Sequence, residues 1–307
     1  MNTSILYPLI NEAGRNYDWA VTEFPQYFVN LETVCPIVWF GNLQADEPKI
    51  ITFGSNPSDK EFHNAGHFLL TNPRFPKFFN RSVTVTPTTM YPPHGVAQNI
   101  EEDDNEYFDN NPYMSWFRPI QNFAKAYFGN GCCIHIDALP FATSQKFTTL
   151  NRNIPASPSI HNPHYHNFGA VLDWGADFAR RLLQEIVDND NVLGIVLVGG
   201  ENIRQFKSIY NRYINGAKKQ NISIGNRKFS IEKMMVNIGS KTIEIIGTSI
   251  YLPNPYGHID IDNIIAQISP YVKDFLQYNT DLLHKFIIYG ASGICQSEFQ
   301  LNCINFL

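Results

Sequence analysis

Two stretches of this chain end an apolar run in polar residues whose types suit chemistry. The run Ile50–Phe53 is followed by Gly-Ser-Asn-Pro at 54–57, and the run Cys132–Ile136 is followed by Asp137. In an open parallel sheet, ligands bind in the crevice outside the carboxyl ends of the strands. A glycine there lets the backbone approach a ligand closely, and a proline stiffens the turn. Held in such a frame, Asn56 can orient a water molecule or the edge of a base.

Alternating strands and helices must position these loops. Buried apolar runs predict strands, and apolar residues at helical spacing predict helices. The expected strands cover about 48–53, 132–136, 192–198, 229–237 and 241–247, and the expected helices about 114–127, 168–188, 201–214 and 260–278. This alternation, with loops at the strand ends, predicts an α/β fold: a three-layer α/β/α sandwich around a mainly parallel central sheet.

One large domain accounts for most of the chain. Residues 1–45 are expected to form an N-terminal extension, residues 46–278 the α/β domain, and residues 279–307 a C-terminal tail packed on it. Within the domain, residues 82–112 read as a long insertion with little periodicity, and loops of this size are usually functional or mobile. The acidic run Glu101–Asp104 in this insertion is expected to be exposed.

The composition indicates a globular protein. The chain has 307 residues, of which 44% are hydrophobic and 17% charged. No apolar run reaches the ~18 residues of a membrane span, and Met1–Ile10 lacks the basic stretch of a secretion signal. The formal net charge of −5 argues mildly against bulk nucleic-acid binding, although local patches could supply a basic footprint. We therefore expect a cytoplasmic monomer with no membrane partner.

Neither the cysteines nor the histidines have the spacing of a metal site. The five cysteines contain no Cys-x-x-Cys pair, which argues against a disulfide framework, a zinc site or an iron–sulfur site and fits a reducing cytoplasm. His161, His164 and His166 lie in a Pro- and Asn-containing stretch with no helix to fix a pair of ligands. We expect a solvated loop there, and neither a metal nor a cofactor.

Three loops that follow strands carry a resemblance to a known family. They are Gly54-Ser55-Asn56-Pro57, Asp137-Ala138-Leu139-Pro140 and Leu252-Pro253-Asn254-Pro255. Their order and spacing resemble those of the uracil-DNA glycosylase superfamily, over roughly residues 46–275. The Gly-x-Asn-Pro form is similar to that of the mismatch-specific and single-strand-selective branches.

The resemblance implies roles for individual residues. Asn56 would position the attacking water, and Asp137, at the end of its strand, would read a flipped base. The base would also be contacted by Ser55 and Pro57 and stacked on by Phe68. The late loop would grip DNA, and it comprises Pro253, Asn254, Pro255, Tyr256 and His258.

Two positions depart from the family pattern. Leu252 stands where many members have a catalytic histidine, although the mismatch-specific branch also lacks it, and His258 is a candidate replacement. Asp137 stands where the uracil enzymes have asparagine. An amide both donates and accepts, as uracil requires, whereas an ionised carboxylate only accepts, which suits the N4 amine of cytosine. A protonated Asp137 could instead donate to cytosine N3, and the sequence leaves its protonation state open.

The resemblance thus implies a monofunctional DNA glycosylase that flips a nucleotide and hydrolyses its base–deoxyribose bond. No lysine lies in Gly54–Ser58, so a Schiff-base lyase step is not indicated. Asp137 and the insertion favour a modified cytosine, hydroxymethylated or glucosylated, as the substrate in antiviral defence. Two alternatives remain: repair of uracil or mispaired thymine, and a glycosylase-like fold that binds DNA or a protein without chemistry. Each of the main site residues also has a purely structural alternative: a helix cap for Asn56, a turn former for Asp137 and a core residue for Phe68.

Overall fold

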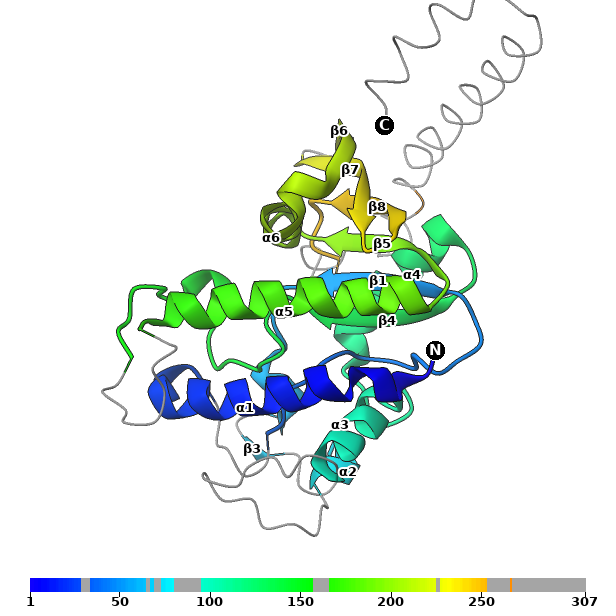
Figure 1. Ribbon diagram of the computed structural model, residues 1–307. Helices are drawn as coiled ribbons and strands as arrows, with labels where there is room; N and C mark the ends of the chain where they lie inside the picture. Colours follow the sequence, from blue (N-terminus) through cyan, green and yellow to red (C-terminus); the bar gives the residue numbers. More distant parts are fainter. Residues whose placement is uncertain are drawn as a thin grey trace, which may run out of the picture.

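A six-stranded sheet lies at the centre of the protein (Figure 1), in a computed structural model that describes residues 1–28, 34–64, 67–68, 73–79, 95–156, 166–224, 227–252 and 266. Its strands are β1 (Lys49–Gly54), β4 (Cys132–Asp137), β5 (Val192–Val198), β6 (Ile214–Ile224), β7 (Arg227–Ile238) and β8 (Lys241–Thr248). The order is β4-β1-β5-β8-β7-β6; the first four run parallel, and β7 and β6 are each antiparallel to the preceding neighbour. A separate small sheet pairs β2 (His63–Asn64) with β3 (His67–Phe68).

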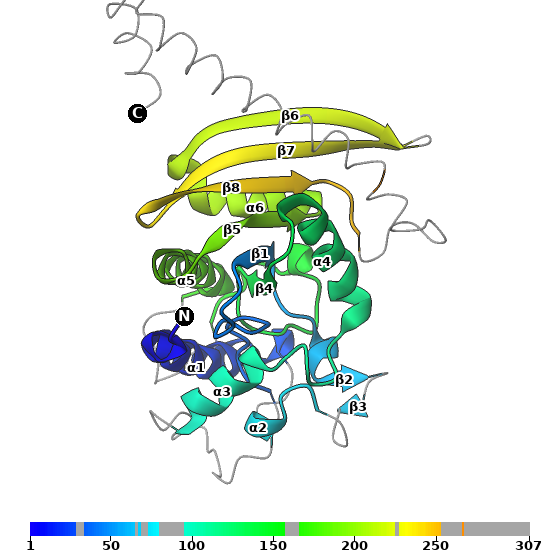
Figure 2. The ribbon, with the colours of Figure 1, turned by 90° about the vertical axis from the view of Figure 1, so that its right-hand side faces the viewer.

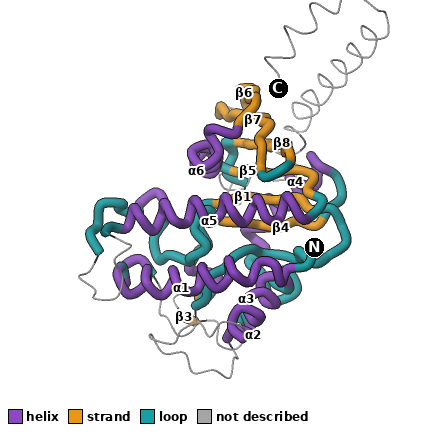
Figure 3. Tube along the Cα trace, viewed as in Figure 1, coloured by secondary structure: helices purple, strands orange, loops and turns teal. Residues whose placement is uncertain are grey.

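Helices surround this sheet (Figure 3). The longer ones are α1 (Tyr7–Glu23), α3 (Gly95–Asn105), α4 (Met114–Phe128), α5 (Phe168–Asn189) and α6 (Gly200–Tyr210). The short ones are α2 (Pro76–Phe79) and the 3₁₀ turns η1 (Thr3–Leu6), η2 (Pro25–Tyr27), η3 (Asp59–Glu61), η4 (Phe147–Thr149) and η5 (Asn211–Tyr213).

Two hydrophobic cores lie on opposite faces of the sheet. Ile51 and Phe53 belong to the larger core with α1, α5 and α6, whereas Ile50 and Val196 belong to the smaller core with α4. Figure 2 shows α4 and α5 on opposite sides of the central strands. Because helices cover both faces, β1 and β5 read as continuous apolar runs rather than as alternating patterns.

The predicted α/β class and the mostly parallel sheet are confirmed. The strands expected at 48–53, 132–136, 192–198 and 241–247 correspond to β1, β4, β5 and β8. Strand β6 was missed, because the helix expected at 201–214 ends at Tyr210 and an exposed edge strand with little apolar alternation follows. The tail at 279–307 and the helix expected at 260–278, apart from the helical Ala266, lie outside the described residues.

The expectation that the acidic run Glu101–Asp104 is exposed is wrong. The run lies on α3 within the insertion, and Asp103 and Asp104 are fully buried. Asp103 accepts hydrogen bonds from two backbone N–H groups of α2, at 3.0 and 2.7 Å, and Asp104 accepts from the backbone N–H groups of Val38 and Trp39, at 3.0 and 3.3 Å. The carboxyl oxygens of these two residues satisfy buried backbone donors, which is why the two side chains are not left to solvent.

The N-terminal 45 residues contribute to the larger core. Ile10 and Tyr17 of α1 are fully buried in it. Arg181 of α5 donates to Glu12 of α1, with Nη1 2.8 Å from Oε2. The helix therefore packs against α5 and shares the core of the α/β sheet.

Candidate functional site

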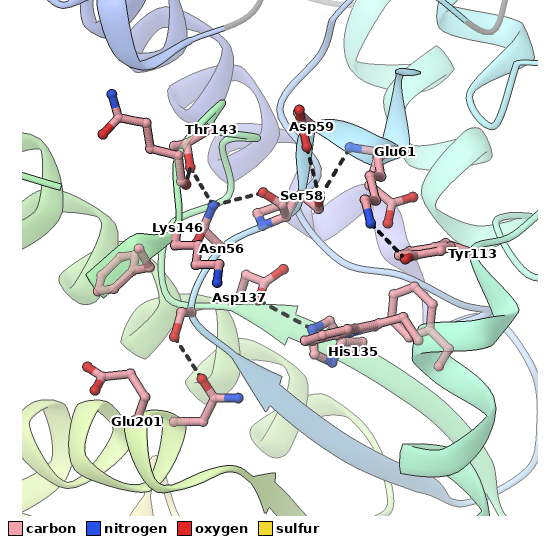
Figure 4. Close-up of a pocket in the computed structure, with 18 of the residues that line it drawn as sticks. Asn56, Ser58, Asp59, Glu61, Tyr113, His135, Asp137, Thr143, Lys146 and Glu201 are labelled. Carbon is pink, nitrogen blue, oxygen red and sulfur yellow. Dashed lines mark hydrogen bonds and ion pairs between the residues drawn. The ribbon is translucent and has the colours of Figure 1, made fainter. Parts of the chain in front are cut away.

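A cleft of about 730 Å³ opens at the carboxyl ends of β1, β4 and β5 (Figure 4), a size typical of ligand sites. Its walls come from the loop after β1, the start of α4, the loop after β4 and the first turn of α6. The lining residues are Phe40, Ser55–Glu61, Tyr113, Ser115–Phe117, His135, Asp137, Thr143–Thr148, Glu201, Asn202 and Tyr251. The cleft thus lies where ligands bind in open parallel sheets.

Hydrogen bonds hold the side chain of Asn56 in one orientation (Figure 4). Its Nδ2 donates to the carbonyl oxygen of Pro57 at 2.8 Å and to Thr143 Oγ1 at 2.9 Å. The Thr143 hydroxyl donates to the carbonyl oxygen of Gln145 at 2.6 Å, so it is available to Asn56 only as an acceptor. Since both neighbours accept, the amide nitrogen must face them. Oδ1 then points away from them, and no group in the described part of the chain donates to it.

Asp137, at the end of β4, is coupled to a buried histidine. His135 Nε2 lies 3.3 Å from Asp137 Oδ1, and His135 Nδ1 lies 2.7 Å from Thr52 Oγ1. Where Asp137 is ionised, its carboxylate only accepts, so Nε2 then carries a proton and donates to Oδ1. The imidazole ring packs between Phe40 and Phe117, at centroid distances of 5.5 and 5.3 Å. The histidine therefore fixes Oδ1, which leaves Oδ2 of Asp137 for a ligand.

Gly54 provides the space that this pair occupies. A Cβ atom at residue 54 would lie 2.2 Å from Asp137 Oδ1 and 2.8 Å from His135 Nε2. Gly54→Ala is therefore expected to displace both side chains and to lower the free energy of unfolding by about 1–3 kcal/mol. In the control Gly216→Ala, the added Cβ meets nothing within 4 Å. Thermal unfolding of both variants checks this, and equal melting temperatures would contradict it.

Ser55 is tied to the helix that follows β5. Its Oγ donates to Asn202 Oδ1 at 2.7 Å, and Asn202 Nδ2 donates to the carbonyl oxygen of Val198 at 2.8 Å. Between strand and helix, Gly199 has a φ of +95°, which glycine adopts without strain. Ser55 thus uses its hydroxyl proton in a hydrogen bond that holds the first turn of α6 against the cleft.

A second carboxyl group, that of Glu61 in η3, lies in the cleft wall. Its Oε2 accepts from the Tyr107 hydroxyl at 2.5 Å and lies 3.7 Å from Arg74 Nε. The pKa of Glu61 is raised to about 7, first by burial and also by the charge of Asp137, against the opposing effects of Tyr107 and Arg74. Among the carboxyl groups that line the cleft, those of Glu61 and Asp137 therefore interact electrostatically.

Aromatic side chains and Lys60 line the cleft, and Arg74 lies next to one of these rings. Lys60 Nζ and the Arg74 guanidinium lie 5.7 and 5.6 Å from the centre of the Tyr113 ring. Trp116 meets Tyr251 edge to face at 5.4 Å, and Tyr251 is 40% exposed. The exposed ring of Tyr251 can stack on a planar ligand, and the neighbouring cations suit an anionic one.

Four residues singled out by the sequence come together in the cleft: Ser55, Asn56, Pro57 and Asp137. Leu252, at the position of the absent histidine, is buried in the smaller core and does not line the cleft. The remaining predicted positions lie outside the described residues: the side chain of Phe68, whose backbone belongs to β3, and Pro253, Asn254, Pro255, Tyr256 and His258, as well as His161 and His164. His166 is described and exposed.

Sequence reasoning missed the three residues that contact or charge Asn56 and Asp137: His135, Thr143 and Glu61. His135 carried a usable signal, because residues two apart on a strand share a face, which places it beside Asp137. Thr143 and Glu61 carried no such signal. One lies in the loop after β4 and the other in the turn η3, and only the tertiary fold brings them to the cleft.

Among the ranges described, no three His, Cys, Asp or Glu side chains converge as a metal ion requires. No helix in those ranges is both long enough and apolar enough to cross a bilayer. Comparison of the chain with family models, curated proteins and solved structures finds no match.

Proposed function

We propose that this protein is a monofunctional DNA glycosylase with the three-layer fold of the uracil-DNA glycosylase superfamily, and that it excises a cytosine-type base. One observation carries the proposal. In the cleft, no described group donates to Oδ1 of Asn56. In the same cleft, His135 fixes Oδ1 of Asp137 and leaves Oδ2 of that carboxylate without a described partner. The first suits a nucleophilic water, and the second suits an exocyclic amine.

Asn56 holds the water in this mechanism. Cleavage of an N-glycosidic bond passes through an oxocarbenium-like sugar, as in glycoside hydrolysis. The flipped nucleotide costs a few kcal/mol of stacking and pairing. An amide is a poor base, so Asn56 Oδ1 orients the water rather than deprotonating it. Most of the acceleration then comes from polar groups preorganised around the departing base.

Asp137 selects the base. With Oδ1 held by His135, Oδ2 accepts from the N4 amine of a cytosine-type base. Uracil would place its O4 lone pairs against the same carboxylate. A site that leaves a buried polar group unpaired with the wrong substrate discriminates strongly, by up to about 10⁴–10⁵-fold in favourable cases.

A modified cytosine suits this cleft better than the unmodified base. General removal of cytosine would damage the host genome, so the substrate is a foreign base, hydroxymethylated or glucosylated, and the role is defence against phage. The cleft has room beyond a pyrimidine ring, and its lining includes the polar groups of Ser58, Asp59 and Gln145, which can hydrogen-bond sugar hydroxyls.

Base excision on a panel of oligonucleotides tests the proposal. Single- and double-stranded substrates would carry uracil, a G·T mismatch, cytosine, hydroxymethylcytosine or glucosylated hydroxymethylcytosine, and alkali would reveal abasic sites. We expect cleavage of a cytosine-type base that depends on the alkali step. Excision of uracil alone would make this a repair enzyme, and binding without excision would indicate a non-catalytic module. Cleavage without alkali would reveal a lyase step by Lys60 or Lys146, which line the cleft among the described residues.

A further inference from the structure

Glu61 lies in the cleft wall and takes no part in the chemistry above. Its Oε2 is occupied by the Tyr107 hydroxyl and faces Arg74, whereas no described residue donates to its Oε1. The purely structural carboxyl of Asp103 differs, because each of its oxygens accepts from a backbone N–H group of α2. Glu61 is 3% exposed, yet it borders the cleft. One oxygen of a buried carboxyl is therefore left for whatever fills the cleft.

The charges around Glu61 determine which carboxyl holds a proton. Two groups face the Glu61 carboxyl at Oε2: the hydroxyl of Tyr107, from the turn after α3, and the guanidinium of Arg74, which precedes α2. Lys60 precedes Glu61 in η3. Asp137 faces it from β4 and has a histidine partner, His135 Nε2 at 3.3 Å, which Glu61 lacks among the described residues. Two nearby carboxyls resist ionising together, so Glu61 is the partner that keeps its proton near neutral pH. Its raised pKa, about 7 and caused first by burial, agrees with this assignment.

We propose that Glu61 is the general acid that protonates the departing base, while the ionised Asp137 accepts from the N4 amine. This inference rests on the proposed glycosylase function. The two carboxyls then form a complementary pair: one presents a donor and the other an acceptor. A neutral cytosine-type base presents the matching acceptors, O2 and N3, next to its N4 donor.

The bond between C1′ and N1 breaks, and its electron pair goes to the base, where the negative charge spreads over N1, O2 and N3. Glu61 transfers its proton to the base and becomes a carboxylate. The water held by Asn56 adds to C1′ and loses a proton to solvent, and Glu61 regains a proton from solvent. The sum is hydrolysis, with no oxidant or cofactor.

The pH dependence of single-turnover excision tests this role. The probe is an oligonucleotide that carries glucosylated hydroxymethylcytosine, or whichever cytosine-type base the wild-type protein cleaves. Because the protonated form is active, wild-type excision is expected to be fastest at low pH and to fall tenfold per unit above pH 7. Glu61→Gln keeps the shape but cannot give up a proton, so we expect a loss of about 10²–10³-fold at pH 6 and a flat profile.

Two further variants separate catalysis from structure. Tyr107→Phe removes a hydrogen bond that lowers the pKa of Glu61, so the falling limb should move to higher pH. The control variant Glu106→Gln changes the residue before Tyr107. The Glu106 side chain is 49% exposed and pairs with Lys77, so the pH profile of this variant should match that of the wild type.

The outcomes distinguish the two proposals. If wild-type protein excises a base and Glu61→Gln keeps both its rate and its pH limb, the general-acid role is wrong and the glycosylase function stands. An unmoved limb in a folded Tyr107→Phe variant would also contradict the role. If wild-type protein excises no base on the panel, the proposed function itself fails, whatever the Glu61 variants do.

Discussion

Replacement of Asn56 by alanine is expected to lower single-turnover excision by about 10²-fold, with little change in DNA binding. The reason is that Asn56 Oδ1 holds the water only at the moment of reaction, and its loss removes positioning rather than proton transfer. Excision rates and oligonucleotide binding measured side by side would check this. A loss of binding equal to the loss of rate would show that Asn56 contacts the DNA rather than the water.

Thr143 offers a graded control for the Asn56 result. Thr143→Val removes the hydroxyl that accepts from Asn56 Nδ2, so the amide can rotate, and we expect an intermediate loss of about tenfold. Thr149→Val removes an exposed hydroxyl that donates to the carbonyl oxygen of Lys146, and excision should be unchanged. A Thr143→Val enzyme as active as wild type would mean that the amide orientation does not matter.

Replacement of Asp137 by asparagine is expected to exchange one base for another. His135 Nε2–H would still donate to the oxygen at position 137, so the new amide NH₂ would take the place of Oδ2. A donor there suits uracil O4 and repels the N4 amine. Excision of the cytosine-type base should fall by about 10²-fold or more, and uracil excision should appear.

The comparison with His135→Phe sharpens this prediction. Phenylalanine fits the space between Phe40 and Phe117 but donates no hydrogen bond, so Asp137 would lose its fixed orientation. We expect slower excision of the same base without a gain in uracil excision. If Asp137→Asn loses activity on every base in the panel, base selection by residue 137 is wrong, and a structural role remains.

The parts of the fold that could be predicted are those where local pattern and burial agree. The strands β1, β4 and β5 are covered on both faces, so their apolar runs stand out, and the polar residues at their ends lie together for that reason. Strand β6 gave no such signal because it is an exposed edge strand. Acidic residues usually lie at the surface. Asp103 and Asp104 are buried instead, because each accepts hydrogen bonds from buried backbone N–H groups.

The candidate site was predictable to the same depth. Asn56 lies two residues past β1 and Asp137 is the last residue of β4, so their neighbourhood could be inferred from the sheet alone. The partners that orient or charge them could not. Thr143 lies several residues after the end of β4, so the strand does not predict its position. Glu61 owes its raised pKa to burial, and no pattern in the neighbouring sequence predicts that burial.

The hydrogen bonds that assemble the cleft join residues far apart in the chain. Asn56 and Thr143 are 87 positions apart, and Ser55 and Asn202 are 147. Contacts of such long range form late, because the intervening chain must first be ordered. During synthesis, which proceeds from the N-terminus, the cleft cannot be complete until Asn202 has left the ribosome. A base-excising activity of this kind would thus be absent from the growing chain and would switch on only once most of the protein has folded.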